Sequence, residues 1–321
     1  MMRAVEIGEP GGPDALRPCE RARPAARPGE IVIAVEAAGV NGPDIAQRKG
    51  LYPPPPGASD LPGLEVSGTV EAVGEGVDGW SCGDAVCALT NGGGYAEAVA
   101  VPVGQCLPIP EGVERRDAAG LPETYFTVWA NVFLDRDWPA ATRLLVHGGA
   151  GGIGSSAVQL GAAHGWTVLA TCSGAKKGFV QSFGATAIDY REEDFVEVTK
   201  GVGGAHVILD MLGGDYVERN MKAAAVDALM VSLAFNRGAR VEANMLPLMV
   251  KRLTWTGSTL RPRDAAFKAR LADDLRTRVW PMFADGRLRT VTHATFPLER
   301  AADAHRAMEA GEHMGKMLLT P

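Results

Sequence analysis

The stretch Leu144-Leu145-Val146-His147-Gly148-Gly149-Ala150-Gly151-Gly152-Ile153-Gly154 decides how the middle of this chain folds. An apolar run that reads as a buried strand leads directly into a complete G-x-G-x-x-G pattern. Glycine is needed there because the chain must turn tightly, let a pyrophosphate approach closer than a Cβ allows, and pack the next helix on the strand. That helix, expected from about Ser155, would point its free N–H groups at the phosphates. The residues expected to bind a dinucleotide here are Gly149, Gly151, Gly152, Ile153 and Gly154.

On both sides of this turn, candidate strands alternate with helical stretches. The helical stretch 155–164 is closed by Gly165, in the position that a C-terminal cap prefers. Such alternation is typical of a doubly wound parallel sheet, so we expect an α/β Rossmann domain over residues 122–259. Its candidate strands are 143–147, 167–171, 186–190, 206–210, 229–233 and 253–257.

The segments on either side of this domain have a different pattern of predicted secondary structure. From Arg3 to about Val113, short β-branched runs are broken by Gly, Pro and Asp, which predicts a small barrel-like β domain. After Leu260 come helical stretches at 264–278 and 298–308 and a last apolar strand at 317–319. We expect this tail to return to the first domain, which would then comprise residues 1–121 completed by 260–321.

The composition and charge of the chain argue against several classes of function. A chain of 321 residues that is 46% hydrophobic can build two globular cores, and a formal charge of -6 argues against a nucleic-acid partner. No apolar run approaches the roughly 20 residues that span a bilayer, and the start MMRAVEIGEP lacks the features of an export signal. Five scattered cysteines without a CxxC fit a reducing compartment. We expect a cytoplasmic protein with small-molecule partners and no membrane partner.

The end of the second candidate strand indicates which dinucleotide is bound. An NAD-binding site would carry an Asp or Glu there for the ribose hydroxyls. The stretch 169–177 contains no carboxylate, whereas Ser173, Lys176 and Lys177 stand where a 2′-phosphate would lie and could bind it by charge-assisted hydrogen bonds. This favours NADPH over NADH, although a solvated helix start would also explain the two lysines.

Several short segments spread over almost the whole chain carry a family resemblance. They include Gly39-Val40-Asn41-Gly42-Pro43-Asp44, Pro62-Gly63-Leu64-Glu65, Gly92-Gly93-Gly94-Tyr95, Leu121-Pro122-Glu123-Thr124, Trp255-Thr256-Gly257-Ser258 and Gly315-Lys316. With these segments the chain resembles the zinc-free quinone oxidoreductases of the medium-chain dehydrogenase/reductase superfamily, and most closely the tumour-suppressor-inducible NAD(P)H quinone oxidoreductase branch. The resemblance implies a GroES-like substrate domain, a Rossmann domain, a homodimer, and a cleft between the domains that holds the nicotinamide. Gly42 departs from that branch, where arginine is common.

The same resemblance indicates that metal is not used. Zinc-dependent relatives bind the ion through a Cys and a His at the positions of Asn41 and Leu64, and neither replacement supplies the thiolate or imidazole that zinc selects. Pro43 replaces the hydroxyl residue that relays an alcohol proton. We therefore expect no metal ion and an acceptor, such as a quinone, that takes up hydride without such help.

By resemblance, Asn41 and Tyr52 would lie near the nicotinamide, with Asn41 able to hydrogen-bond a quinone oxygen, and Thr127 would contact the nicotinamide. Each has a structural alternative: Asn41 could close a turn, Tyr52 could cap the proline-rich loop, and Thr127 could bond its own backbone. Arg261 could likewise form an ion pair that joins the domains. Further residues expected at the cofactor are Tyr190, Ser232, Phe235, Ser258 and Arg261. We expect Glu65 to be a buried structural carboxylate and His147 to be a packing histidine.

Two other functions fit the same sequence. One is an NADPH-dependent enoyl or alkenal reductase, for which Tyr52 could supply a proton. The other is a non-catalytic, crystallin-like protein that binds NADPH without turnover. Assays with a quinone and with a conjugated alkenal distinguish these three possibilities.

Overall fold

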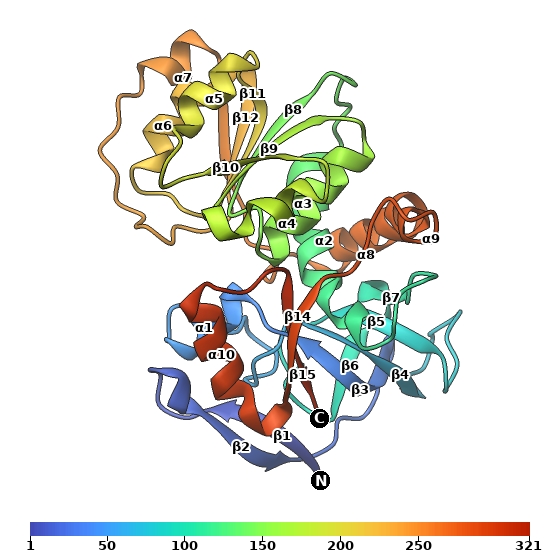
Figure 1. Ribbon diagram of the computed structural model, residues 1–321. Coiled ribbons are helices and arrows are strands. Elements are labelled where there is room, and N and C mark those ends of the chain that lie inside the picture. Colours follow the sequence, from blue (N-terminus) through green and yellow to red (C-terminus); the bar gives the residue numbers. More distant parts are fainter. The chain divides into compact units, whose positions relative to one another are not determined.

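The computed structural model describes residues 1–321, and the chain forms two compact units (Figure 1). The first unit comprises residues 1–127 and 261–321, and the second comprises residues 128–260. Each unit has its own β-sheet and its own hydrophobic core. No helix combines the length and the apolar character needed to cross a membrane.

The second unit is built on a six-stranded sheet whose paired strands are all parallel. The strand order β10-β9-β8-β11-β12-β13 reverses direction at β8, the first of these strands in the chain, as in doubly wound folds. The predicted α/β fold class is therefore confirmed, and all six candidate strands are present: five match their predicted ends to within one residue, whereas β12 begins five residues earlier than predicted. The strands are β8 (Arg143–His147), β9 (Thr167–Cys172), β10 (Thr186–Asp189), β11 (Ala205–Asp210), β12 (Ala224–Ser232) and β13 (Thr254–Gly257).

Helices of the second unit connect these strands, and α3 lies beside β8 and β9 (Figure 1). Gly165 follows α3 with a φ of 74°, the left-handed conformation that ends a helix, as predicted. The core of this unit packs Leu145 and Ile208 of the sheet against Phe195 and Met221 of the helices. The helical elements are η4 (Trp129–Phe133), α3 (Gly152–Ala163), η5 (Gly174–Lys176), α4 (Lys177–Gln181), α5 (Phe195–Gly201), α6 (Tyr216–Ala223) and α7 (Leu246–Val250).

The first unit contains a seven-stranded sheet in the order β14-β15-β3-β4-β5-β7, with β6 paired to β3, and a separate two-stranded sheet of β1 and β2. Most pairs are antiparallel, in agreement with the predicted, mostly β domain. The strands are β1 (Met2–Ile7), β2 (Leu16–Arg21), β3 (Glu30–Gly39), β4 (Glu65–Val73), β5 (Ala85–Leu89), β6 (Ala98–Pro102), β7 (Cys106–Pro108), β14 (Thr292–Pro297) and β15 (Lys316–Thr320).

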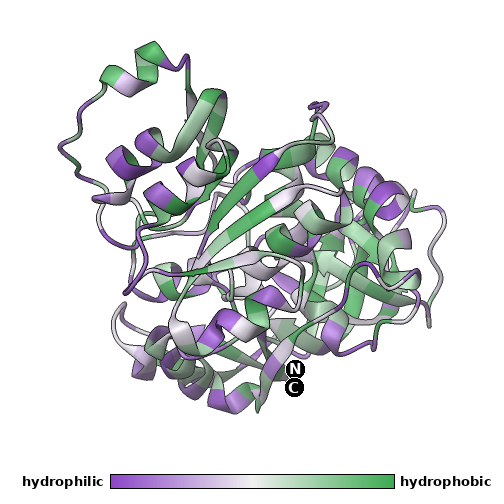
Figure 2. Cartoon of the chain, turned by 45° about the horizontal axis from the view of Figure 1, so that its top comes forward, coloured by the Kyte–Doolittle hydropathy of each residue, from purple (hydrophilic) through white to green (hydrophobic).

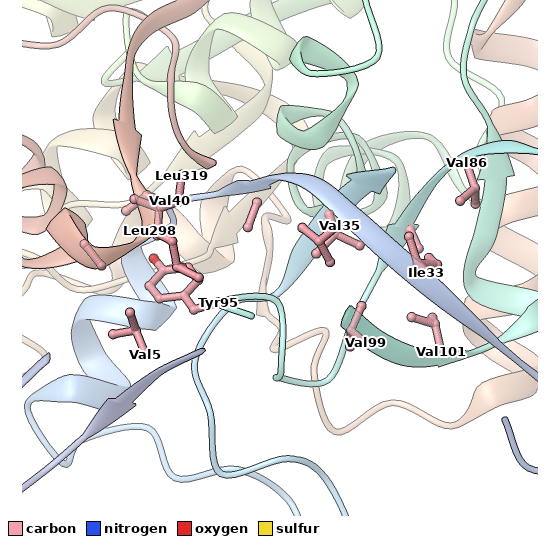
Figure 3. Close-up of a cluster of buried hydrophobic side chains, with 14 of the residues drawn as sticks. Val5, Ile33, Val35, Val40, Val86, Tyr95, Val99, Val101, Leu298 and Leu319 are labelled. Atoms are coloured by element: carbon pink, nitrogen blue, oxygen red, sulfur yellow. The ribbon is translucent and has the colours of Figure 1, made fainter. Parts of the chain in front are cut away.

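The tail of the chain completes this sheet and its core. Strand β15 pairs with β14 on one side and with β3 on the other, where Leu318 faces Gly39. Figure 3 shows Leu298 and Leu319 of the tail beside Val40 and Tyr95, which come from near the start of the chain. Burying large apolar side chains such as these contributes about 1.5–3 kcal/mol each. The core of the first unit thus depends on residues from both ends of the sequence.

Short helices complete the first unit. The predicted helical stretches 264–278 and 298–308 correspond to α8 with η6 and to η7 with α10. In Figure 2 the strands consist largely of hydrophobic residues, whereas the helices also carry hydrophilic residues. The helical elements are η1 (Pro13–Ala15), α1 (Gly42–Arg48), η2 (Val103–Gln105), η3 (Asp117–Gly120), α2 (Pro122–Val128), α8 (Ala265–Asp274), η6 (Leu275–Val279), α9 (Pro281–Ala284), η7 (Leu298–Arg300) and α10 (Ala301–Ala310).

Candidate active site

The glycine turn after β8 has the geometry that its sequence predicts. A Cβ on Gly149 would come within 2.6 Å of the Ala170 Cβ in the neighbouring strand, and a Cβ on Gly154 would overlap the carbonyl oxygen of Gly148. At Gly151, by contrast, the nearest neighbour is the Gly148 oxygen, 3.7 Å from an ideal Cβ position. Two of the glycines are therefore required by close packing, and the third leaves room for a ligand.

The N-terminus of α3 is suited to an anion. Gly151 caps the helix with no side-chain hydrogen bond, and the first bond of the helix runs from the Ser155 N–H to the Gly151 oxygen at 2.8 Å. The N–H groups of Gly152, Ile153 and Gly154 make no hydrogen bond within the protein. Free N–H groups at the positive end of a 12-residue helix fit the pyrophosphate of a dinucleotide.

The other residues predicted to bind the cofactor in this unit also follow the carboxyl ends of strands, which is the ligand-binding edge of a parallel sheet. Ser232 is the last residue of β12, and its hydroxyl accepts a hydrogen bond of 3.0 Å from the Trp255 indole. Ser258 directly follows β13 and donates to the Asn131 side-chain oxygen at 2.8 Å. Phe235 follows β12 and is 43% exposed.

The residues predicted to bind the 2′-phosphate follow β9 and β10. Ser173 precedes η5, Lys176 is the last residue of η5, and Lys177 is the first residue of α4. The Lys177 ammonium lies 2.7 Å from the Glu193 carboxylate, whose hydrogen bond raises the Lys177 pKa and lowers that of Glu193. One of the two predicted phosphate-binding lysines is therefore already paired with a carboxylate.

The aromatic residue predicted at the 2′-phosphate has a cation beside it. Tyr190 is 43% exposed, and the Arg191 guanidinium lies 5.6 Å from the centre of its ring. Sequence reasoning did not identify this arginine, although it adjoins a predicted site residue. Arg191 adds a third positive charge to the edge of the sheet on which Lys176 and Lys177 lie.

A carboxylate at the end of β10, that of Asp189, also lies beside the residues predicted to bind the 2′-phosphate. Asp189, the last residue of β10, is buried, and its Oδ2 would lie 2.5 Å from a Cβ on Gly174. The stretch 169–177 has no carboxylate of its own, so the sequence around β9 did not reveal this one. The parallel pairing of β9 with β10, in which Cys172 faces Asp189, brings it there.

In the first unit, buried polar groups gather around Glu65, the first residue of β4. Its Oε1 accepts hydrogen bonds from the Asn41 side-chain nitrogen at 2.9 Å and pairs with the Lys316 ammonium at 2.6 Å. Its Oε2 accepts the backbone N–H of Glu123 at 2.8 Å. The predicted structural role of Glu65 is confirmed, because a fully buried carboxylate here joins β4, β15 and α2. A Cβ on Gly39 would overlap the Glu65 carboxylate, which explains the glycine at that position.

Asn41 is fixed within this network. Its side-chain nitrogen also donates to the Gly39 oxygen at 3.3 Å, and its side-chain oxygen accepts from Lys316 at 2.6 Å. Both N–H bonds of the amide thus have partners within the protein. Asp44 accepts the backbone N–H of Asn41 at 2.9 Å, and burial raises the Asp44 pKa to about 6.

Glu123, in the first turn of α2, was not assigned a role from sequence. The residue is 9% exposed, and its carboxyl group accepts no hydrogen bond within the protein. Burial, followed by the charges of Glu65 and Asp44, raises its pKa to about 8, against the opposing effect of Lys316 and Lys268. A carboxylate in the otherwise apolar run from Ala118 to Trp129 was the signal in the sequence.

Tyr52 and Arg261 lie together in the first unit. The Arg261 guanidinium is 5.7 Å from the centre of the Tyr52 ring and donates to the Asn91 backbone oxygen and to the Gln47 side chain, both at 2.8 Å. Burial, and then the charge of Glu123, raises the Tyr52 pKa, so its hydroxyl keeps its proton at neutral pH. Thr127 is half-buried near the end of α2.

Two further observations concern metal and acid–base chemistry. No group of three or more His, Cys, Asp or Glu side chains comes together in an arrangement that could hold a metal ion. His147 is fully buried between the Thr171 hydroxyl at 3.1 Å and the Asn220 side chain at 2.7 Å, and it lies against the Phe195 ring. The predicted packing role of His147 is confirmed.

Comparisons with known protein families match both parts of the chain. Residues 27–111 match the alcohol dehydrogenase GroES-like domain, and residues 183–319 match the zinc-binding dehydrogenase family. Quinone oxidoreductase from Rattus norvegicus is 31% identical over 327 residues, covering 99% of this chain and 98% of the relative. The synaptic vesicle membrane protein VAT-1 homolog from Danio rerio is also 31% identical, covering 99% of this chain and 70% of the relative.

Solved structures show the same architecture over the whole chain. Escherichia coli quinone oxidoreductase complexed with NADPH has a TM-score of 0.87 at 29% identity, covering 99% of this chain and 100% of that one. CurK enoyl reductase has a TM-score of 0.86 at 26% identity and covers 99% of each chain.

A GroES-like unit together with a Rossmann unit, whose glycine turn is preserved, defines a dehydrogenase/reductase of two-domain architecture. The chain belongs to the medium-chain dehydrogenase/reductase superfamily, and quinone oxidoreductases about 30% identical to it are among its relatives.

Proposed function

We propose that this protein is an NADPH-dependent oxidoreductase that reduces quinones without a metal ion. The observation that carries the proposal is the glycine turn and uncapped helix after β8, with Lys176, Lys177 and Arg191 following the two neighbouring strands. Relatives named as quinone oxidoreductases support the choice of acceptor.

Each group of residues has a part in binding the cofactor. The glycine turn and the N–H groups of α3 would hold the pyrophosphate. Ser173, Lys176, Lys177 and Tyr190 would hold the 2′-phosphate, for which charge-assisted hydrogen bonds are suited. Bound NADPH would supply the hydride. The residues proposed to contact the nicotinamide portion are Thr127, Ser232, Phe235, Ser258 and Arg261.

The donor set supports reduction without zinc. Leu64 has no electron pair to offer to a metal ion. The Asn41 side-chain amide donates both of its N–H groups to protein oxygens, and its oxygen accepts a hydrogen bond from Lys316. We infer that Asn41 positions neighbouring groups through this network, while the half-buried Tyr52 faces the acceptor. Quinones suit such a site because their conjugated carbonyls accept hydride readily.

Conjugated alkenals are the second candidate acceptors. CurK enoyl reductase shares the fold, and the protonated Tyr52 hydroxyl could donate to a reduced alkenal. Comparing the rates of NADPH oxidation with 1,4-benzoquinone and with a conjugated alkenal tests the choice. Faster turnover of the alkenal would contradict the proposal, and tight NADPH binding without any turnover would point to the crystallin-like role.

Cofactor choice is tested by the affinities of NADPH and NADH. We expect the wild-type protein to bind NADPH more tightly, and the variant Lys176→Ala/Lys177→Ala to lose most of that preference. Fluorescence titration measures both dissociation constants. A wild-type preference for NADH would overturn the proposal and would direct attention to Asp189 as the ribose ligand.

We further propose a homodimer formed through β13. This strand is at the edge of the parallel sheet, and all four of its residues are exposed. Apolar side chains nearby are exposed as well: Met249 is 71% and Val250 62% exposed. An edge strand with open hydrogen-bonding groups and adjacent apolar surface can pair with a second copy about a twofold axis.

A further inference from the structure

Glu123 stands apart from the other buried carboxylates of the first unit. Glu65 and Asp44 each accept hydrogen bonds from backbone N–H groups, and Glu65 also pairs with Lys316. The Glu123 carboxyl group accepts none, although its own backbone N–H is held by Glu65 at 2.8 Å. The network therefore fixes the backbone at Glu123 and leaves its acid group available.

The surroundings of Glu123 are those of the proposed acceptor site. Glu123 and Thr127 are four residues apart on α2 and so lie on one face of the helix. Electrostatic interactions join Glu123 to Tyr52 and to Arg261, which themselves lie 5.7 Å apart. Glu123, which the sequence did not predict, thus shares a helix face with the predicted Thr127, and its charge acts on the predicted Tyr52 and Arg261.

Charged groups from several elements act on Glu123. Glu65 of β4 and Asp44 of α1 oppose its ionisation, while Lys316 of β15 and Lys268 of α8 favour it. Burial is the largest influence, and the pKa is raised from 4.5 to about 8. Since this lies above neutral pH, Glu123 is mostly a neutral carboxylic acid at pH 7, with a proton to donate.

We propose that Glu123 is a catalytic acid that donates its O–H to the carbonyl oxygen of a conjugated carbonyl acceptor. A neutral acid placed there stabilises the negative charge that develops on that oxygen as hydride arrives. The acceptor would gain two electrons and one hydrogen as hydride from bound NADPH, which would be oxidised to NADP⁺, and its oxygen takes a proton from Glu123. The O–H bond of the acid breaks as the hydroxyl bond of the product forms, and the Glu123 carboxylate regains a proton from solvent.

This inference rests on the proposed function, and Glu123→Gln tests it. The amide cannot deliver a proton, but it keeps the size of the side chain and the backbone bond to Glu65. We expect kcat with 1,4-benzoquinone to fall by roughly 100-fold, at the lower end of what a general acid contributes, while the Kd for NADPH stays unchanged. Glu114→Gln, the same substitution at an exposed position, is the matched control and should retain wild-type kcat.

The pH profile is the second readout. The neutral form is active, so wild-type kcat should be constant below about pH 8 and fall tenfold per unit above it. Lys268 titrates in the same range, because burial lowers its pKa to about 8. The alkaline decline must therefore disappear in Glu123→Gln; a decline that persists unchanged would overturn the proposal.

A measurement without turnover completes the test. Infrared difference spectra of the ligand-free protein should show a protonated carboxyl group that ionises near pH 8 and is missing from Glu123→Gln. If Glu123→Gln does not fold, Glu123→Ala should regain activity with added acetic acid, and the absence of rescue would count against the proposal. Wild-type activity matched by Glu123→Gln would overturn this inference alone. A wild-type protein that reduces no conjugated carbonyl compound would overturn the proposed function as well.

Discussion

At the scale of single residues, Gly154 shows how the glycine turn depends on the absence of a Cβ. The variant Gly154→Ala would push a methyl group into the Gly148 carbonyl oxygen, which belongs to the turn itself. We expect it to be destabilised by about 1–3 kcal/mol, as for an overpacked site, and to bind NADPH weakly. Urea unfolding measures the first effect and fluorescence titration the second.

Gly178→Ala is the matched control for that prediction. Gly178 lies within α4, and nothing stands within 4 Å of its ideal Cβ position. The change should therefore stabilise the protein by about 0.4–1 kcal/mol through the unfolded chain. Equal losses in the two variants would show that the packing argument is wrong.

Glu193 limits the charge that Lys177 can offer to a phosphate. The two groups are 2.7 Å apart, so Glu193→Gln would leave the Lys177 ammonium unneutralised. We expect the Kd for NADPH to fall by up to about fivefold, a modest change because solvent screens an exposed ion pair. The Kd for NADH should not change. Glu192→Gln, an exposed neighbour, is the control, and weaker NADPH binding by Glu193→Gln would contradict a role for Lys177 at the phosphate.

Lys316 compensates the buried charge of Glu65. The variant Lys316→Met would leave that carboxylate without its cation, and breaking such a buried pair costs about 3–5 kcal/mol. Lys200→Met breaks an exposed pair with Glu197 and should cost no more than about 1 kcal/mol. Chemical denaturation compares the two. If Lys316→Met is no less stable than Lys200→Met, the network around Glu65 does not stabilise the first unit.

At the scale of elements, the two edges of the parallel sheet differ in their surroundings. All four residues of β13 are exposed, and α7, which precedes it in the chain, carries the exposed apolar residues Met249 and Val250. Strand β10 forms the opposite edge, and three of its four residues are buried. We expect Thr256→Lys to prevent dimer formation, because a charged side chain on an edge strand opposes pairing with a second copy. Thr186→Lys, on β10, should leave the dimer intact.

Sedimentation velocity at several concentrations measures the assembly state of both variants. A wild-type monomer, or a Thr256→Lys variant that remains dimeric, would show that β13 does not form the interface.

The sequence was most informative about the positions of the secondary-structure elements. Five of the six strands of the parallel sheet could be placed because each contains a short apolar run, and burial on both faces requires such runs. The exception is β13, whose four residues are exposed. Their ends were less certain: β12 begins at Ala224, five residues before the predicted start at 229. The exposed Asp227, with a φ of 61°, interrupts the apolar residues of this strand and separates Ala224-Ala225-Val226 from the run that was predicted.

At the scale of the whole molecule, the two units differ in how the chain forms them. The second unit is continuous, whereas the first needs residues 261–321 to supply β14 and β15. We expect a fragment of residues 128–260 to fold alone with a cooperative thermal transition followed by circular dichroism. A chain truncated after residue 312 should lose the structure of the first unit, because β15 lies between β14 and β3.

Both transitions can be followed in one set of measurements. A non-cooperative fragment 128–260, or a truncated chain that unfolds like the full one, would contradict this division of stability.

The sequence by itself determined what depends on neighbours along the chain: the strand periods, the glycine turn, the start of α3 and the residues that follow β9. Only the tertiary structure decided which distant groups meet. It brought Asp189 to the end of β9, tied Lys177 to Glu193, and satisfied the Asn41 amide internally. It also placed Glu123 among buried charges from four other elements. The physical reason is that strand pairing and burial set the electrostatic surroundings of a side chain, and neither can be read from the residues beside it in sequence.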